Sequence, residues 1–494
     1  MENFVNTLNG YIWSNALILL ALGAGLFFSL KTRFVQIRLF KEMIRLLFSG
    51  ASSNKGISSF QALSVSLSGR VGTGNIAGVA AAIGFGGPGA VFWMWIVAFL
   101  GASTAYIEST LGQIYKEEQD GEYRGGPAYY IEKAMGAKWF AWIFAIAIIV
   151  ANGILLCGVQ ANSIGNAVEL ALGGGKTVDT FFGPLSSIKI STAIVVLILL
   201  AFIVFGGVKR IANVTQVIVP FMALAYIIIA LTIIGLNISQ LPDILILIVS
   251  DAFTPMAGAG AAIGWGVRRG IYSNEAGQGS SVHAAAAAEV DHPAQQGLVQ
   301  AFSVYIDTLF VCSATAFMIL ITGAYNVHGD GSQFIIQNIA PTIDANSPAF
   351  TQYAMENTIP GLGAPFVAVA LFFFAFTTIL AYYYQAETNI AYLRRTYKFP
   401  GDMLILKIVM LASVFYGSVK TAQVAWGLGD IGIGILTWLN VISILVIFFM
   451  SNPAVKALKD YEEQKRKKVN VFRFDPVSLD IKNAHFWEDR NKQH

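Results

Sequence analysis

The chain has few charged residues and only two cysteines. Of its 494 residues, 12% are charged and 55% are hydrophobic, whereas a soluble domain carries about 25% charged residues. This composition excludes a disordered chain and an ordinary soluble enzyme, and a mean hydropathy of +0.61 predicts that lipid surrounds much of the surface. Cys157 and Cys312 are too few for a disulfide scaffold or a cysteine-based metal cluster.

Histidine is also scarce, and none of the five histidines lies inside a long apolar run. This pattern argues against a histidine-based metal site or proton relay within a membrane. The spans offer no HExxH pattern and no nucleophile–base pair, so we expect neither an enzyme nor a cofactor. The net charge of +3 implies no acidic partner such as a nucleic acid. A channel is disfavoured because no filter-like repeat is present.

Eleven stretches are long and apolar enough for membrane helices, since a spanning helix needs about 20 mostly apolar residues. The first stretch follows no basic leader and no cleavage site, which predicts a retained span and not a signal peptide. The eleven are Ser14–Leu30, Phe60–Phe85, Ala90–Tyr115, Trp139–Leu170, Ile190–Phe205, Ile218–Leu236, Ile244–Ile271, Val299–Thr322, Phe366–Leu393, Met403–Ser418 and Ile431–Met450.

Basic residues are distributed unevenly among the segments between these spans. If the loop after span 1 is cytoplasmic, 28 of the 32 lysines and arginines fall in cytoplasmic segments and span ends, including Arg268 and Arg269. The positive-inside rule then predicts an external N-terminus and a cytoplasmic C-terminus. The tail after Asn452, with its basic run Lys465–Lys468, is expected to be solvated. Contact with anionic lipid headgroups is the other interpretation.

Glycine is concentrated in two windows of 22 residues, in or next to spans 2 and 7. Ser68–Gly89 contains eight glycines and Gly258–Gly279 contains seven, whereas the average density gives about two per window. Dense glycine within an apolar span favours an interrupted helix, with close helix packing as the alternative. The stretches Gly69–Gly74 and Gly264–Gly266 look most like interruptions.

Spans 2 and 7 are five apart and therefore cross the membrane in opposite directions. Spans 2–6 and 7–11 then predict two five-helix repeats of inverted topology, an all-α polytopic architecture with discontinuous helices that is typical of secondary transporters. The predicted domains are an extra N-terminal helix and cytoplasmic loop over residues 1–55, repeats over 56–240 and 241–451, and a cytoplasmic basic tail over 452–494.

The predicted break in span 2 provides a site for an anion beside a cation. If the helix breaks near Gly72–Gly74, the second half-helix begins near Asn75 with free N–H groups that attract a carboxylate. The side chains of Thr73 and Asn75 can add contacts. The first half-helix ends near Gly69–Val71, and its free carbonyl oxygens suit a cation.

Other spans contribute further candidates for this site. In span 9 the adjacent hydroxyls of Thr377 and Thr378 can add oxygen ligands for sodium, although such hydroxyls often bond to their own helix. Gln160 in span 4 either contacts a substrate amine or links helices. In span 7, Trp265 between Gly264 and Gly266 marks the expected break and either walls a small pocket or packs as an ordinary core residue.

Arg70 is a costly residue inside span 2, because a central arginine costs roughly 2.5–3.5 kcal/mol on insertion scales. We therefore expect a structural or gating ion pair. Contact with a substrate carboxylate and exposure in a water-filled vestibule are the alternatives. The candidate partners are Glu108, Asp251, Glu275, Asp307 and Glu387.

Three segments resemble signatures of the alanine or glycine:cation symporter family. They are Arg70–Ala80 (RVGTGNIAGVA), Gly266–Ser280 (GVRRGIYSNEAGQGS) and Phe376–Thr388 (FTTILAYYYQAET). The resemblance covers nearly the whole chain and implies a leucine-transporter-type fold of the amino acid–polyamine–cation superfamily, with an extra helix before a ten-helix core. It also implies a set of site residues: Thr73, Gly74, Asn75 and Ile76 for the substrate carboxylate, and Ser68, Val71, Thr377 and Thr378 for sodium.

The sequence thus predicts a sodium-coupled symporter that imports alanine or glycine by alternating access across a prokaryotic inner membrane. Its expected partners are the amino acid, the sodium ion and the lipid bilayer, with no obligatory protein partner. A proton-coupled small amino acid symporter is the alternative, in which Glu108, Asp307 or Glu387 titrates.

Overall fold

The chain folds almost entirely into helices. The computed structural model describes residues 2–49, 53, 55–180, 183–205, 207–254, 258–329 and 333–493. The helices of the first half are α1 (Glu2–Ile12), α2 (Asn15–Lys31), α3 (Val35–Arg38), α4 (Phe40–Leu47), α5 (Ser59–Arg70), α6 (Ala77–Gly86), α7 (Ala90–Ile114), α8 (Pro127–Met135), α9 (Lys138–Val150), α10 (Cys157–Ala171), α11 (Ser187–Val204) and α12 (Gly207–Leu236). Those of the second half are α13 (Leu241–Phe253), α14 (Ala259–Asn274), α15 (Val282–Ala287), α16 (Pro293–Tyr305), α17 (Ser313–Thr322), α18 (Ala349–Thr358), α19 (Gly363–Arg394), α20 (Asp402–Val419), α21 (Ala422–Met450), α22 (Pro453–Arg466) and α23 (His485–Gln493).

Short helical turns and three small hairpins complete the described fold. Two turns are 3₁₀, η1 (Thr73–Asn75) and η3 (Ile238–Gln240), and two are π-helical, η2 (Ala151–Leu156) and η4 (Ile306–Cys312). The antiparallel strand pairs are β1 (Glu117–Gln119) with β2 (Glu122–Arg124), β3 (Thr177–Thr180) with β4 (Gly183–Ser186), and β5 (Asn326–His328) with β6 (Phe334–Gln337). The π-helical turns lie inside predicted spans 4 and 8, where the helix ladder is locally widened.

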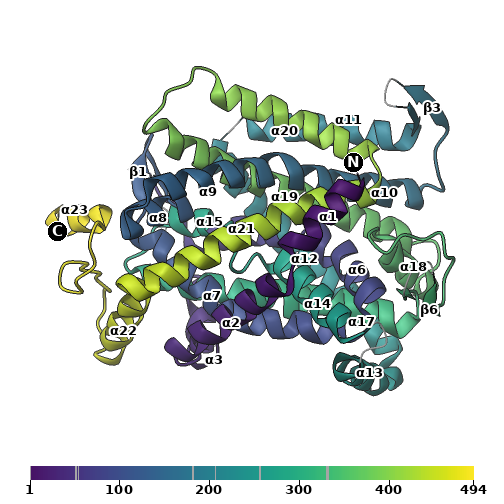
Figure 1. The fold of residues 1–494 in the computed structure, drawn as a ribbon, viewed down its shortest axis with the longest axis horizontal. Coiled ribbons are helices and arrows are strands. Elements are labelled where there is room, and N and C mark those ends of the chain that lie inside the picture. Colours follow the sequence, from purple (N-terminus) through teal and green to yellow (C-terminus); the bar gives the residue numbers. More distant parts are fainter. Residues whose placement is uncertain are drawn as a thin grey trace.

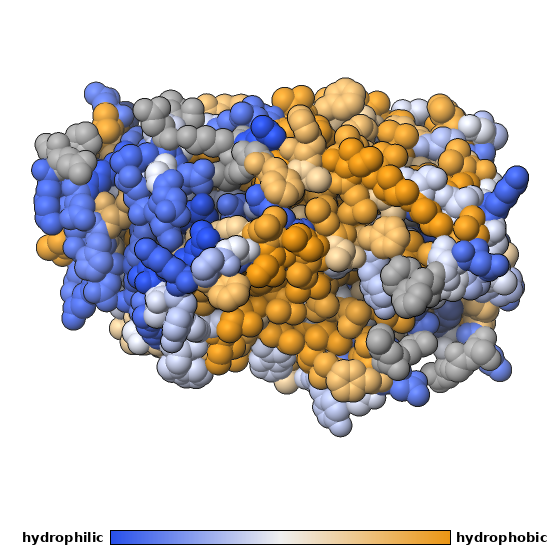
Figure 2. All heavy atoms as spheres, turned by 90° about the horizontal axis from the view of Figure 1, so that it is seen from above, coloured by the Kyte–Doolittle hydropathy of each residue, from blue (hydrophilic) through white to orange (hydrophobic). Residues whose placement is uncertain are grey.

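Nine helical runs among the described residues are long and apolar enough to cross a membrane. They match nine of the eleven predicted spans. Spans 2 and 7 fall short because each is divided into shorter helices. Large apolar side chains on α11, α12 and α20, such as Phe202, Phe221 and Leu404, are exposed. Hydrophobic residues occupy the middle of the face in Figure 2, and hydrophilic ones gather at one end. This distribution is that of a multi-pass membrane protein.

The long helices run along the long axis of the molecule, and the two ends of that axis differ (Figure 1). One end carries α22, α23 and the β1–β2 hairpin and is called the tail face here. The other end carries α18 and the β3–β4 hairpin (Figure 1).

Span 2 is interrupted where the sequence predicts. Helix α5 ends at Arg70, η1 forms a single turn over Thr73–Asn75, and α6 begins at Ala77. The residues of this break are fully buried, including the polar side chains of Thr73 and Asn75. Irregular backbone is therefore enclosed by protein, which is the condition for tolerating it at membrane depth.

Span 7 differs from its prediction. Helix α14 is continuous through Gly264, Trp265 and Gly266, so the break expected there is wrong. Gly266 serves packing, because a Cβ there would lie 2.5 Å from the backbone oxygen of Ala90 in α7, whereas a Cβ at Gly264 would meet nothing closer than 3.7 Å. Helix α13 ends at Phe253 and α14 begins at Ala259, and a non-helical stretch follows α14 between Asn274 and Val282.

The shift in span 7 changes the place of two basic residues. Arg268 and Arg269 lie inside α14 and not at its end, and both form ion pairs with the buried Asp430 of α21. Both arginines therefore take part in the packing of α14 against α21.

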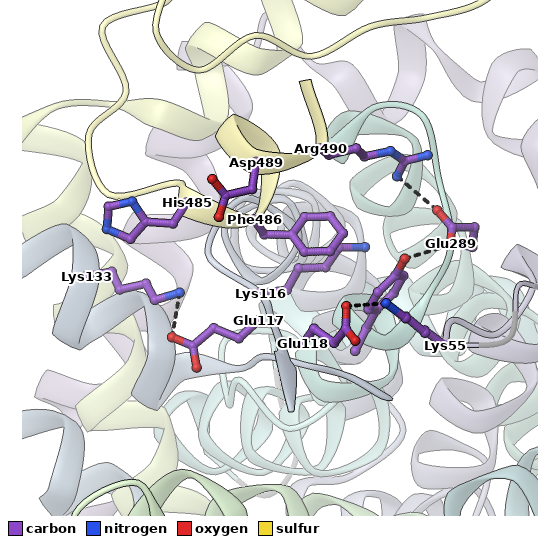
Figure 3. Close-up of a pocket in the computed structure, with 11 residues that line it drawn as sticks. Lys55, Lys116, Glu117, Glu118, Lys133, Glu289, His485, Phe486, Asp489 and Arg490 are labelled. Carbon is purple, nitrogen blue, oxygen red and sulfur yellow. Dashed lines mark hydrogen bonds and ion pairs between the residues drawn. The ribbon is translucent and has the colours of Figure 1, made fainter. Parts of the chain in front are cut away.

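The tail packs onto the protein and is not simply solvated. Trp487 of α23 is buried and donates to the carbonyl oxygen of Gln113 at the end of α7. Lys116 lies over the rings of Tyr123 and Phe486, at 4.4 and 4.6 Å from their centroids, beside a cavity of about 640 Å³ (Figure 3). Burial lowers the pKa of Lys116 to about 7, whereas the surrounding rings favour its charged form.

Ion pairs hold the tail elsewhere on this face. Lys465 of α22 pairs with Glu42 of α4 at 2.8 Å. Arg490 of α23 pairs with Glu289 at 2.9 Å, just after α15 (Figure 3). The basic run therefore contributes to intramolecular contacts through Lys465.

Candidate functional site

At the break in span 2, peptide N–H groups that have no partner within a helix bond to side chains. The N–H of Gly72 donates to the side-chain oxygen of Asn75 at 2.8 Å, and the N–H of Thr73 donates to Oε1 of Gln160 in α10 at 3.0 Å. The Thr73 hydroxyl is fully buried and has no hydrogen-bond partner among the described residues. An unpaired buried hydroxyl is costly, so Thr73 provides a polar group that a ligand can satisfy.

The predicted carboxylate site is therefore partly occupied by the protein itself. The N–H groups of Asn75 and Ile76 donate to the carbonyl oxygens of Gly72 and Thr73 within the turn. Gln160 lies at the break as predicted, but its side-chain oxygen accepts the Thr73 N–H that we expected to bind a carboxylate. Gly74 has no room for a side chain, because a Cβ there would lie 3.0 Å from Tyr272 in α14.

The end of α5 and the middle of α19 form a cluster of oxygen atoms. The Thr378 hydroxyl lies 2.7 Å from the carbonyl oxygen of Ser68, 2.9 Å from that of Phe374 and 3.4 Å from that of Val71. Carbonyl oxygens at the end of a helix lack intrahelical partners, and uncharged oxygens of this kind suit a hard cation. Ser68, Val71 and Thr378 are thus brought together as the sequence predicts.

Thr377 lies beside this cluster without contacting α5. Its hydroxyl donates to the carbonyl oxygens of Phe373 and Phe374, at 2.9 and 3.1 Å. The second of these oxygens is shared with Thr378, so the two hydroxyls meet at Phe374.

Asp307, predicted only as a possible partner of Arg70 or as a titrating group, instead joins the two interrupted spans. Asp307 in η4 accepts from the side-chain nitrogen of Asn75 at 2.6 Å and from the hydroxyl of Ser273 at 3.0 Å. The Thr308 hydroxyl also donates to it, at 2.8 Å. Asp307 therefore ties the break in span 2 to the last turn of α14 through the π-helical turn of span 8.

Arg70 is buried but forms no direct ion pair with any described carboxylate. Its guanidinium donates to the hydroxyls of Ser281 and Ser303 and to the carbonyl oxygen of Gln300. The expected ion pair is thus replaced by neutral acceptors, which keep the charge buried. The carboxylates whose charges act on Arg70 at longer range are Glu275, Glu108 and Asp307.

The other two proposed partners of Arg70 lie elsewhere. Asp251 of α13 accepts from the N–H of Gly89, and Glu387 lies 3.9 Å from Arg124 of β2. Neither carboxylate therefore contacts Arg70.

Gly264, Trp265 and Gly266 do not join the break. Trp265 stacks on Phe85, near the end of α6, with ring centroids 4.7 Å apart, and Phe85 stacks in turn on His328. The aromatic stack lies about two helical turns from the break. Position in the sequence misled us here because Trp265 precedes the true interruption by ten residues.

The interruption after α14 was missed, although the sequence contains a signal for it. The run from Ser273 to Ser280 has five polar residues and two glycines, with no apolar periodicity. Such a run within a membrane segment favours a non-helical stretch. Glu275 ends α14 in a left-handed conformation, and its carboxylate lies against Gly69 of α5. The two interruptions therefore face each other.

The chain is similar to known proteins over nearly its whole length. The model of the family described as "Sodium:alanine symporter family" matches residues 1–475. The chain is 57% identical to YrbD of Bacillus subtilis (strain 168), a candidate sodium/proton-dependent alanine carrier, over 99% of this chain and 98% of that protein. It is 48% identical to the sodium/proton-dependent alanine carrier protein of Bacillus sp. (strain PS3), over 91% of this chain and 98% of that protein.

A solved structure shows a similar fold. The crystal structure of MhsT in complex with L-phenylalanine aligns with a TM-score of 0.50 at 14% identity, covering 81% of this chain and 100% of that chain. The likeness extends to the fold alone, which is of the leucine-transporter type.

Proposed function

This chain belongs to the sodium:alanine symporter family, and we propose that it imports a small neutral amino acid, alanine or glycine, together with a sodium ion. The family and the named relatives are transporters, so the chain is a membrane transport protein and not an enzyme. The observation that carries the proposal is the contact of the Thr378 hydroxyl with the carbonyl oxygens at the end of α5, at the same break as the Thr73 amide.

Sodium is held between α5 and α19 in this proposal. The carbonyl oxygens of Ser68 and Val71 and the hydroxyl of Thr378 supply ligands from two helices, and Thr377 adds a second hydroxyl. A cation at this position rotates the Thr378 hydroxyl so that its lone pairs face the ion. It also holds the end of α5 against α19, which fixes the shape of the break.

The amino acid then lies across the break, with its carboxylate at the start of α6. The substrate carboxylate accepts from Thr73 and takes over the role that the Gln160 oxygen has in this conformation. Gln160 becomes free to accept from the substrate ammonium group. Gly74 and Ile76 line the same turn, and the close approach of Tyr272 at Gly74 limits the side chain to a small one.

Binding of both ligands favours closure, after which the two repeats of the inverted-repeat core rock to open the opposite side. Inward movement of one positive charge gains about 2.3 kcal/mol per 100 mV of membrane potential. The protein lies in a prokaryotic inner membrane with its tail face in the cytoplasm. Its partners are the amino acid, sodium and lipid, and it needs no other protein.

Uptake into proteoliposomes tests this function. Radiolabelled alanine should accumulate when a sodium gradient is imposed and should not accumulate when potassium replaces sodium on both sides. Unlabelled alanine should compete, whereas ethylamine, which lacks the carboxylate, should not. Equal competition by ethylamine would remove the proposed carboxylate site.

Proton coupling is the second candidate function. The two most similar relatives reported above are named for dependence on both sodium and protons. Glu108 and Asp307 are buried carboxylates close to the break. Alanine uptake driven by a pH gradient in sodium-free buffer would support this candidate over sodium coupling alone.

A further inference from the structure

A carboxylate that the proposed sodium and alanine sites do not use lies between the two interruptions. Glu275 is 1% exposed, and neither of its oxygens accepts a hydrogen bond from the described residues. A Cβ at Gly69 would lie 3.2 Å from Oε2 and 3.3 Å from Oε1, so the carboxylate rests against the end of α5. A buried carboxylate without donors is far more costly when it is ionised than when it is protonated.

The two other carboxylates of this region differ from Glu275. Glu108 in α7 accepts from the N–H of Gly277 at 3.3 Å and from the side-chain nitrogen of Asn440 at 2.7 Å. Asp307 accepts from three donors, one of which is Asn75 of the break. Both accept well-formed hydrogen bonds from two or more donors, whereas the one donor near Glu275 among the described residues is the Ser280 hydroxyl, which forms no regular hydrogen bond with it.

The balance of buried charge points to the same group. Among the described residues, Arg70 is the cation whose charge acts on all three carboxylates, and it makes no ion pair with any of them. The remaining titratable groups that act on Glu275 or feel its charge are the phenols of Tyr272 in α14 and Tyr382 in α19, which are neutral. One positive charge cannot balance three negative ones among buried groups, and the carboxylate with the weakest hydrogen bonding is the one that takes up a proton.

The neighbourhood of Glu275 also has room for the extra hydrogen bond. The hydroxyl of Ser280 interacts with Glu275 but forms no regular hydrogen bond with any residue that the structure describes. When Glu275 is protonated, its O–H group can donate a hydrogen bond to this hydroxyl oxygen. Glu275 also has φ of +57°, a left-handed conformation that non-glycine residues rarely adopt. Its side chain is thus held at the start of the non-helical segment that joins α14 to α15.

We propose that Glu275 is a proton-binding site that takes up one proton when the two interrupted spans close on each other and releases it when they separate. The proton comes from water and adds to a carboxylate oxygen, and release restores the carboxylate and returns the proton to water. The inference rests on the proposed function, because the separation of the spans is a step of transport. It makes the proton an additional coupled ion beside sodium.

The pH inside proteoliposomes tests this proposal. Vesicles that contain a trapped pH-sensitive dye are loaded with the full-length protein, and alanine is added with sodium equal on both sides. The wild type should show an alanine-driven pH change in the lumen. Glu275→Gln, which has the shape of the protonated acid but cannot release a proton, should lose that change by at least tenfold. Glu387→Gln is the matched control, because Glu387 is also largely buried with an unpaired oxygen but lies beside Arg124.

Infrared spectroscopy of the purified protein gives a second readout that does not depend on transport. The wild type at neutral pH should show the C=O stretching band of a protonated carboxylic acid. This band should be lost in Glu275→Gln and should remain in Glu387→Gln.

The outcomes separate the two proposals. Sodium-driven alanine uptake by the wild type, without a luminal pH change and without the protonated-acid band, would overturn the role of Glu275 and leave sodium symport intact. A pH change that persists at full size in Glu275→Gln would also overturn it. Absence of any alanine uptake by folded wild-type protein would instead contradict the proposed function. The wild-type measurements decide the matter even if Glu275→Gln does not fold.

Discussion

Two glycine-rich segments that look alike in the sequence behave differently in the fold. Around Gly72 the helix ends, the chain makes a single 3₁₀ turn and a new helix begins. Around Gly266 the helix continues without interruption for 16 residues. Both segments are closely packed, since a Cβ would lie 2.5 Å from its nearest neighbour at either glycine.

The nature of that nearest neighbour separates the two segments. At Gly72 it is the hydroxyl of Thr378, with the side-chain oxygen of Gln160 next. At Gly266 it is the backbone oxygen of Ala90, with Trp93 next. The missing side chain therefore lets polar side chains approach the backbone at Gly72 and lets another helix approach it at Gly266. The difference predicts that substitutions in the first segment impair ligand binding and those in the second impair folding.

Gly72→Ala is expected to have the largest effect on transport. The added methyl group displaces Thr378 and Gln160 together, and overpacking of this kind costs about 1–3 kcal/mol, which corresponds to about 5- to 150-fold in affinity. Sodium-dependent alanine uptake should fall by at least about 100-fold, because sodium and substrate contacts are both disturbed. Gly78→Ala in α6 is the matched control, since its Cβ would meet nothing closer than 3.7 Å. Similar uptake by the two variants would remove the distinction drawn for Gly72.

Asn75→Ala should weaken alanine binding by about 10- to 100-fold. The substitution leaves the N–H of Gly72 without an acceptor and removes one donor from an oxygen of Asp307, and each unsatisfied buried group costs about 1–3 kcal/mol. Asn75→Asp should be worse than Asn75→Ala, because it places a second carboxylate against Asp307. Equilibrium binding of labelled alanine to purified protein measures both. Equal affinity in the two variants would show that the contact with Asp307 does not matter.

Gly266→Ala should lower stability and leave the ligand sites intact. Its methyl group meets backbone of α7 that cannot move aside, at an expected cost of about 1–3 kcal/mol. The thermal unfolding midpoint in detergent should decrease, while the sodium dependence of the remaining folded protein stays the same. Gly264→Ala is the control, because its nearest neighbour lies at 3.7 Å. A change in sodium affinity with normal stability would place Gly266 in the binding machinery.

Thr377→Ala should have the smallest effect. Its hydroxyl bonds to its own helix and reaches the sodium site through the shared oxygen of Phe374. Loss of a hydrogen bond of this kind costs about 0.5–1.5 kcal/mol, so the sodium affinity should change by less than about tenfold. Sodium titrations of alanine uptake measure the change. A loss larger than that of Thr378→Ala would make Thr377 the principal ligand.

The sequence predicted the broken span 2 for a physical reason. Glycines at positions 69, 72 and 74 lie among Arg70, Thr73 and Asn75. Polar and charged side chains are costly in an uninterrupted membrane helix, so their presence beside the glycines indicates a functional break. The nine uninterrupted spans were also predictable, because long apolar runs leave few other structures in lipid.

The second interruption was placed wrongly because glycine alone does not distinguish a break from close packing. Trp265 and its neighbours are apolar apart from Arg268 and Arg269, and the polar run that does interrupt the helix begins at Ser273. Partners contributed by distant segments, such as Asp307 for Asn75 and Ser281 for Arg70, were not predictable, because contacts between spans depend on helix rotation and on π-helical turns that the sequence does not reveal.

Equilibrium binding of radioactive sodium to the purified protein tests the central claim most directly. The claim is that the end of α5 and Thr378 of α19 form the cation site at the break in span 2. The account predicts saturable sodium binding by the wild type, an affinity at least tenfold lower in Thr378→Ala, recovery in Thr378→Ser, and normal affinity in Gly264→Ala. Unchanged sodium affinity in folded Thr378→Ala would contradict it.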